Sequence, residues 1–289
     1  MADSIINSQS INSADILLLG ACYDLTSSFG KGANRGPQAI VDTLHTQIEF
    51  LDRESQVSPA EHLAIAYNEI EGLPDASPED MVSSIAAQYA EHSSSFKILL
   101  GGEHSVTNGP LRYFASDASD ITVLQIDAHA DLRFDDSDYN DTPYGIYAHS
   151  AVMRRALELG YNIVQVGLRA FSAEEQSLFS HERITALERR RQEISPEAVL
   201  SHIKTDKVYL TIDLDGFDPS VMPATGTPVP GGLGWYEGLD IARAVIQNHS
   251  LVGFDIVELA TRSVDSITQY NAAQLCYSLI AELYKKGEI

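Results

Sequence analysis

Short runs of aliphatic and β-branched residues recur along the chain, and turn-forming residues bound each of them. Runs of this length are typical of strands rather than helices, so we expect a strand at each. The expected strands are Ile16–Ala21, His62–Ala66, Phe96–Leu100, Ile121–Asp127, Asn162–Gly167, Lys207–Asp213 and Leu251–Val257. The runs 121–126 and 208–212 are almost continuously apolar, which indicates parallel strands covered by helices on both faces.

Between these runs the apolar residues recur with the period of a helix. The expected helices are Ser77–His92, His149–Leu159, Ser172–Leu178, Pro196–Lys204, Tyr236–Asn248 and Ser266–Lys285. Ser77 precedes Pro78 as an N-cap, and Ser172 with Glu175 fits a capping box. Strands and helices alternate, which predicts a three-layer α/β/α fold around a mainly parallel sheet. No linker, low-complexity segment or fixed repeat divides the chain, so we expect a single domain over residues 1–289.

Carboxylates and imidazoles follow four of the expected strands. Ligands of parallel sheets bind beyond the carboxyl ends of the strands, where the loops converge. At such ends the sequence places His104, Asp127, His129, Asp131, Asp213, Asp215 and Glu258. Asp127, His129 and Asp131 alternate along the chain, so extended backbone would turn all three side chains to one face. Asp213 and Asp215 repeat this spacing.

All of these side chains except Glu258 form a candidate metal site. Each motif by itself also fits a structural role, because a lone Asp-x-Asp often caps a turn and a lone histidine often makes a polar contact. Clustered carboxylates at the end of a buried sheet, however, would repel one another unless a cation neutralised them. Oxygen and nitrogen ligands without cysteine suit a hard divalent ion such as manganese, and the carboxylates are numerous enough to bridge two ions.

Composition narrows the class of protein. The chain has 289 residues, 44% of them hydrophobic, and its 41 acidic and 19 basic residues give a formal charge of −22. This charge disfavours nucleic acid and anionic lipid surfaces as partners and favours a small cationic substrate. No apolar run approaches the roughly 20 residues that span a bilayer, and the first residues lack the pattern of a secretory leader. We therefore expect a cytoplasmic protein that does not enter membranes.

Three blocks of sequence carry a family resemblance. They are Gly101-Gly102-Glu103-His104-Ser105, Asp127-Ala128-His129-Ala130-Asp131, and the segment 213–233, which begins Asp213-Leu214-Asp215 and ends Gly231-Gly232-Leu233. These blocks resemble the signatures of the ureohydrolases, the arginase and agmatinase family, and the likeness runs from residues 32–37 to residues 255–258. It implies the arginase-like fold, with a mainly parallel sheet of about eight strands between helices. It also implies a homo-oligomer, usually a trimer or hexamer.

The resemblance further implies two Mn²⁺ ions per subunit. One ion would be held by His104, Asp127, Asp131 and Asp213, and the other by His129, Asp127, Asp213 and Asp215. A hydroxide bridging the ions would attack the guanidinium carbon of the substrate. Glu258 would pair with the guanidinium group, and Asp131 would protonate the leaving amine with His149 as the proton shuttle. Without the resemblance, Glu258 could equally be a surface residue at a strand end and His149 the first residue of a helix.

The loop 132–148 bears on the substrate. It lacks the serine- and asparagine-bearing pattern with which arginases bind an α-carboxylate, and it contains four aspartates, Asp135, Asp136, Asp138 and Asp141. These side chains would repel a carboxylate and attract the ammonium group of a decarboxylated substrate, unless the loop is simply a solvated acidic face. The sequence therefore favours an agmatinase, which converts agmatine and water to putrescine and urea.

Other activities remain open from sequence. A few loop residues decide the length and charge of the substrate tail, so arginase, guanidinobutyrase and guanidinopropionase are alternatives within the family. A non-catalytic, metal-stabilised subunit is an alternative outside the enzymes. Nickel or cobalt would suit the same ligands as manganese. Arg169, which follows a strand, fits a surface salt bridge better than a contact behind the site or with another subunit.

Overall fold

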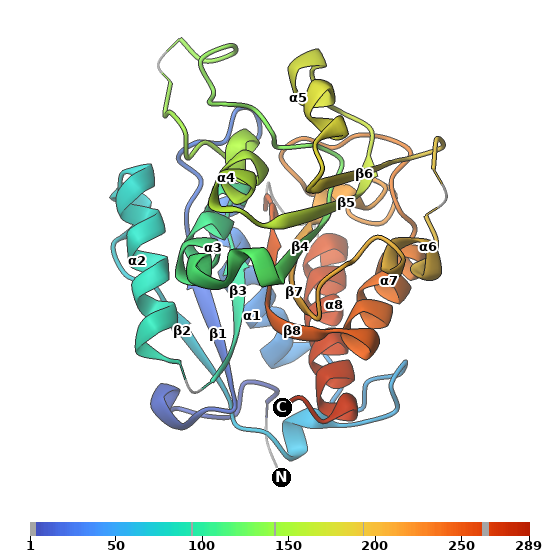
Figure 1. Ribbon diagram of the computed structural model, residues 1–289. Helices are drawn as coiled ribbons and strands as arrows, with labels where there is room; N and C mark the ends of the chain where they lie inside the picture. Colours follow the sequence, from blue (N-terminus) through green and yellow to red (C-terminus); the bar gives the residue numbers. More distant parts are fainter. Residues whose placement is uncertain (1–3, 94, 142, 193, 262–265) are drawn as a thin grey trace.

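Eight parallel strands form one sheet in this computed structural model, which describes residues 4–93, 95–141, 143–192, 194–261 and 266–289. The strands are β1 (Ile16–Ala21), β2 (Ile65–Glu69), β3 (Phe96–Gly101), β4 (Ile121–Ile126), β5 (Asn162–Leu168), β6 (Ile184–Glu188), β7 (Lys207–Asp213) and β8 (Ser250–Val257). Their order across the sheet is β2-β1-β3-β8-β7-β4-β5-β6 (Figure 1). All neighbouring pairs are parallel.

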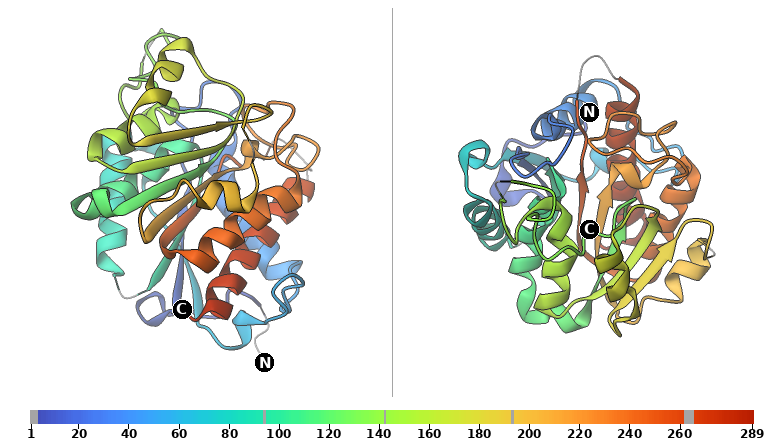
Figure 2. Two further views of the ribbon diagram at one scale, coloured as in Figure 1. Left: turned by 45° about the vertical axis from the view of Figure 1, so that its right-hand side comes forward. Right: turned by 90° about the horizontal axis from the view of Figure 1, so that it is seen from above.

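Helices cover both faces of this sheet (Figure 2). They are α1 (Gly36–Thr46), α2 (Pro78–Glu91), α3 (Asn108–Tyr113), α4 (Val152–Leu159), α5 (Ala173–Ser177), α6 (Pro196–Leu200), α7 (Trp235–Asn248) and α8 (Ser266–Lys286). On one face α1, α7 and α8 pack together, and on the other face α2, α3 and α4 do. The three-layer α/β fold expected from the sequence is therefore confirmed. Among the described residues, no helix combines the length and apolar character required to cross a membrane.

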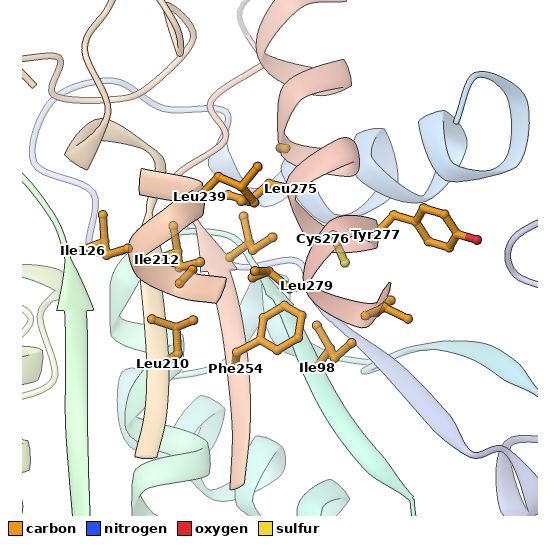
Figure 3. Close-up of a cluster of buried hydrophobic side chains, with 14 of the residues drawn as sticks. Ile98, Ile126, Leu210, Ile212, Leu239, Phe254, Leu275, Cys276, Tyr277 and Leu279 are labelled. Carbon is orange, nitrogen blue, oxygen red and sulfur yellow. The ribbon is translucent and has the colours of Figure 1, made fainter. Parts of the chain in front are cut away.

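The largest part of the core lies between the sheet and the layer of α1, α7 and α8. Phe254 of β8 lies there beside Leu279 of α8 and near Leu239 of α7, and all three side chains are buried (Figure 3). Alternate residues of a strand supply opposite faces. In β1, for example, Leu18 contributes to this cluster and Leu19 to the cluster beneath α2.

Four elements differ from the sequence-based expectation. β6 was not predicted, because it is a short edge strand in which only Ile184 and Leu187 are buried, so it lacks a continuous apolar pattern. α1 and α3 were also not predicted, since Gly36-Pro37 and Gly109-Pro110 at their beginnings suggest turns. β2 begins three residues later than expected, because the backbone N–H of Ala64 is occupied by the Asp15 carboxylate before the strand starts.

The strand order determines where the polar side chains gather. β3, β8, β7 and β4 are consecutive in the sheet, and these are the four strands whose ends carry the candidate site residues. Parallel strands end on the same edge, so the side chains that follow them converge above the middle of the sheet.

The core makes a first prediction. We expect Phe254→Ala to lower the free energy of unfolding by about 3–5 kcal/mol, because it removes a fully buried ring between the sheet and α8. Leu51→Ala, at a side chain that is 54% exposed, should change it by only about 0.5 kcal/mol. Urea denaturation of both variants measures the difference. Equal stability of the two would contradict this description of the core.

Candidate metal centre and active site

His104 stands at the centre of a buried group of carboxylates. It follows β3 and begins a short 3-10 helix. Its Nδ1 lies 3.1 Å from Oδ2 of Asp127, 3.0 Å from Oδ2 of Asp131 and 3.4 Å from Oδ2 of Asp213. The four side chains come from the ends of β3, β4 and β7, and none is more than 5% exposed. The structure thus brings together the residues that the sequence proposed for one metal ion.

A second group shares one of these carboxylates. Nδ1 of His129 lies 3.1 Å from Oδ2 of Asp215 and 3.5 Å from Oδ1 of Asp127. Asp127 therefore presents one oxygen to each histidine, which is the arrangement of a ligand that bridges two ions. Asp213, which was also expected to bridge, lies in the His104 group, and its Oδ1 accepts a 2.8 Å hydrogen bond from the backbone N–H of Asp215. Its bridging role stays a prediction.

The electrostatics of these groups favour positive charge. Burial opposes protonation of His104, but hydrogen bonds to Asp127, Asp131 and Asp213 raise its pKa well above the ordinary value. Burial and the neighbouring Asp215 and Asp127 carboxylates raise the pKa of Asp213 strongly. Nδ1 of His104 is buried, and it faces the three carboxylates at 3.0–3.4 Å. Oxygen and nitrogen donors arranged in this way fit divalent cations such as Mn²⁺.

Neighbouring donors fix the direction of the carboxylates. Asp127 accepts 2.6 Å hydrogen bonds from Gln125 Nε2 and from the backbone N–H of His129. Asp215 accepts from the Thr227 hydroxyl at 3.0 Å and from the backbone N–H of Ala128 at 3.2 Å. Such outer contacts orient metal ligands and are part of a functioning metal site.

Arg169 binds the backbone of the segments that carry Asp215 and Thr227. Its guanidinium group donates to the backbone carbonyls of Asp215 at 2.6 Å, Val229 at 2.8 Å and Gly167 at 3.0 Å. It is half-buried, and burial lowers its pKa. The expectation of a surface salt bridge is therefore wrong: Arg169 ties the end of β5 to the loop that carries Asp215 and Thr227.

Glu258 lies beside the His104 group rather than on the surface. It follows β8 with a φ of 67°, and its Oε1 accepts a 2.9 Å hydrogen bond from the backbone N–H of His104. Burial, and then the charge of Glu103, raises its pKa to about 8. A carboxylate in this position can form a bidentate pair with a planar guanidinium group, which would restore its ionised form.

His149 lines the same cavity as His104 and Glu258. Its backbone N–H donates to the Thr26 hydroxyl at 3.0 Å, and its Nε2 lies 3.2 Å from Oγ of Ser28. Burial lowers the pKa of His149 to about 4. The imidazole is therefore neutral at pH 7 and can accept a proton within the cavity.

A cavity of about 550 Å³ opens above these groups. His104, His129, Asp131, Asp213, His149 and Glu258 all line it. Further lining residues, which sequence reasoning did not assign to the site, are Phe29, Phe171, Glu175 and Thr227. Glu175 was identified only as the capping-box residue of α5, which it is. The position of α5 beyond β5, the neighbour of β4 in the sheet, is the signal that could have placed it at the site.

The acidic loop does not contribute its aspartates to this cavity. Asp136 is buried and accepts from the backbone N–H groups of Tyr144 and Gly145, while Asp138 pairs with Arg133. Asp135 binds the hydroxyl and backbone N–H of Ser137, and Asp141 is exposed. None of the four lines the cavity, although Arg133 and Tyr139 of the same loop do. These contacts show the aspartates shaping the loop, and their attraction of a substrate ammonium stays a prediction.

Comparisons with known proteins identify the family of this chain and agree with its fold. Residues 14–281 match the model of the arginase family. An N(1)-aminopropylagmatine ureohydrolase of Synechocystis sp. is 36% identical over 281 residues, covering 92% of this chain and 88% of the relative. The crystal structure of an agmatine ureohydrolase of Thermoplasma volcanium superposes with a TM-score of 0.83 at 26% identity, covering 100% of this chain and 96% of that one. Trypanosoma cruzi formiminoglutamase with Mn²⁺ shares the fold at a TM-score of 0.80 and 19% identity, covering 96% of both chains.

The fold and the site together define a metal-dependent hydrolase. The ends of four adjacent parallel strands carry histidines and aspartates that could hold metal ions. The chain belongs to the arginase family and is a ureohydrolase, an enzyme that acts on guanidino compounds.

The metal centre makes a second prediction. Mn²⁺ at a hundredfold excess over its Kd should stabilise the metal-free protein by about 2.7 kcal/mol, and a chelator should reverse the effect. Asp127→Asn should abolish most of this stabilisation, because Asp127 contributes to both groups, whereas Asp120→Asn, at an exposed aspartate, should retain it. Thermal unfolding with and without Mn²⁺ measures all three proteins. An Asp127→Asn variant that Mn²⁺ stabilises like the wild type would place the ions elsewhere.

Proposed function

We propose that this ureohydrolase uses two Mn²⁺ ions per subunit to release urea from a guanidinoalkylamine, with agmatine giving putrescine as the leading reaction. The observation that carries this proposal is the charge of the cavity. Its acidic lining includes Glu258 beside the metal centre and Glu175 on α5. Arg133 is the one lysine or arginine among the described lining residues, and it is already paired with Asp138 and lies 3.9 Å from Glu175.

This distribution of charge favours an amine over a carboxylate at the end of the substrate. A carboxylate tail would approach Glu175, which is buried and would repel it in a region of low dielectric. A primary ammonium group would instead balance the one negative charge that remains when Arg133 is set against Glu175 and Asp138. Arginine, 4-guanidinobutyrate and 3-guanidinopropionate all carry the carboxylate that this arrangement disfavours.

The residues divide the reaction between them. One ion would be held by His104, Asp127, Asp131 and Asp213, and the other by His129, Asp127, Asp213 and Asp215. Bound divalent ions supply chemistry by lowering the pKa of water, which makes hydroxide available at neutral pH for attack on the guanidinium carbon. Glu258 orients the guanidinium group. Asp131 would take up the proton that the attacking hydroxide releases and give it to the amine that leaves, with the neutral His149 accepting and passing on a proton in the cavity.

N(1)-aminopropylagmatine is the second candidate substrate. The cavity is larger than the metal centre requires, and Phe29, Tyr139 and Phe171 give it aromatic walls. Aromatic faces attract alkylammonium groups, so these walls would suit a tail with an additional amine. The relative of Synechocystis that is 36% identical bears the name of this activity. The homo-oligomer and the cytoplasmic location that were inferred from the sequence stay predictions, whichever substrate the enzyme uses.

The proposal predicts a substrate order. With Mn²⁺, urea release should be fastest from agmatine or N(1)-aminopropylagmatine and at least tenfold slower, in kcat/KM, from L-arginine and 4-guanidinobutyrate, a difference of about 1.4 kcal/mol or more. A chelator should abolish urea release from every one of these substrates. Preference for a carboxylate-bearing compound would refute the charge argument, and absence of urea from every compound would favour a non-catalytic subunit.

The role of Glu175 can be tested separately. Glu175→Gln should lower kcat/KM for agmatine about tenfold, mainly through KM, because it removes one ionic contact with the tail. It should leave kcat/KM for 4-guanidinobutyrate unchanged or higher. Glu174→Gln is the matched control, since Glu174 is the exposed neighbour on the same helix. If Glu175→Gln weakens both substrates equally, its effect is structural, and Glu175 does not read the tail charge.

A further inference from the structure

A chain of buried polar groups extends from His104 into the sheet, away from the cavity. Nε2 of His104 lies 2.8 Å from the hydroxyl of Thr211, and this hydroxyl lies 2.6 Å from Oδ1 of Asp255. The exposed fractions of the three residues are 1%, 0% and 0%. Thr211 on β7 and Asp255 on β8 are direct partners in the sheet register, so the backbone fixes their separation.

Asp255 is held in place by hydroxyl groups. Its Oδ2 accepts from the Thr107 hydroxyl at 2.9 Å and from the Tyr209 hydroxyl at 2.8 Å, in addition to the Thr211 hydroxyl on Oδ1. Three converging O–H donors suit an acceptor-only carboxylate. A buried carboxylate with such partners is well oriented and has no freedom to turn its oxygens elsewhere.

The direction of the hydrogen bonds follows from the number of protons. A threonine hydroxyl has one proton, and the Thr211 hydroxyl donates it to Oδ1 of Asp255. The Thr211 oxygen can then only accept from His104, so Nε2 of His104 carries a hydrogen. The remaining ring nitrogen, Nδ1, faces Asp127, Asp131 and Asp213, and its lone pair becomes available to a divalent cation when that cation displaces the Nδ1 proton while Nε2 keeps its hydrogen.

We propose that Asp255 and Thr211 are positioning residues that hold His104 in the orientation and tautomer needed to bind a divalent cation. Metal-binding histidines commonly donate directly to a carboxylate or carbonyl. Here the Thr211 hydroxyl lies between the imidazole and the carboxylate. Because it donates its proton to Asp255, its oxygen accepts the hydrogen of His104 Nε2. The inference rests on the metal centre of the proposed function, but it concerns cation affinity rather than the substrate.

Three threonine variants test the relay. Thr211→Val keeps the shape of the side chain but removes the hydroxyl, and we expect Mn²⁺ to bind about 10–100-fold more weakly. Thr211→Ser restores the hydroxyl and should restore most of the affinity. Thr122→Val is the matched control, because Thr122 is also a fully buried threonine of the sheet but its hydroxyl pairs with Thr205, away from His104 and Asp255. It should lower stability without changing Mn²⁺ affinity.

Asp255→Asn provides a second route in case the valine variant does not fold. It is isosteric, and its amide nitrogen would donate to the Thr211 oxygen while its carbonyl accepts from Thr107 and Tyr209. The Thr211 proton would then turn to Nε2 of His104 and drive the imidazole hydrogen to Nδ1, where it blocks cation binding. We expect a loss of Mn²⁺ affinity similar to that of Thr211→Val.

The readout is the Kd of Mn²⁺, measured by calorimetry on metal-free protein, with circular dichroism to verify folding. Weak binding in Thr211→Val and Asp255→Asn, with near-normal binding in Thr211→Ser and Thr122→Val, supports the relay. Normal binding in folded Thr211→Val or Asp255→Asn, or an equal loss in Thr122→Val, overturns it. Wild-type protein that binds Mn²⁺ but releases no urea would refute the proposed substrates and leave the relay standing, whereas wild-type protein without Mn²⁺ affinity would refute both.

Discussion

The repulsion between buried carboxylates at one edge of the sheet is the constraint on which the rest of this structure depends. The order β3-β8-β7-β4 places four strand ends side by side, and their loops bring Asp127, Asp131, Asp213 and Asp215 around two imidazoles. Burial together with the charge of Asp127 raises the pKa of Asp131 to about 7, which shows how unfavourable a further negative charge is there. Divalent cations would relieve this repulsion. The sheet order that brings the carboxylates together is therefore also the reason that the site favours metal ions.

Much of this could be predicted from sequence because it depends on local patterns. The continuous apolar run 121–126 indicates a strand covered on both faces, and the alternation of Asp127, His129 and Asp131 indicates side chains turned to one point. The blocks around His104 and Asp213 supplied the other ligands. The edge strand β6 escaped detection because one of its sides has no neighbouring strand and only Ile184 and Leu187 of its side chains are buried.

Other features depend on tertiary contacts that no local pattern encodes. The loop aspartates were expected to attract an ammonium group, and the structure shows that Asp136 accepts from backbone N–H groups and that Asp138 pairs with Arg133. Glu175, which is about 40 residues after the aspartates of this loop, lines the cavity, because β5 lies next to β4 and α5 follows β5. The partnership of Thr211 with Asp255 likewise requires the register of β7 against β8, which the sequence does not specify.

The most direct test of the central claim is anomalous X-ray scattering at the manganese absorption edge from crystals grown with Mn²⁺. The carboxylate repulsion predicts two manganese peaks, one bound to Nδ1 of His104 and the other to Nδ1 of His129, with Asp127 contacting both. A single peak, or peaks away from the edge formed by β3, β8, β7 and β4, would contradict the account.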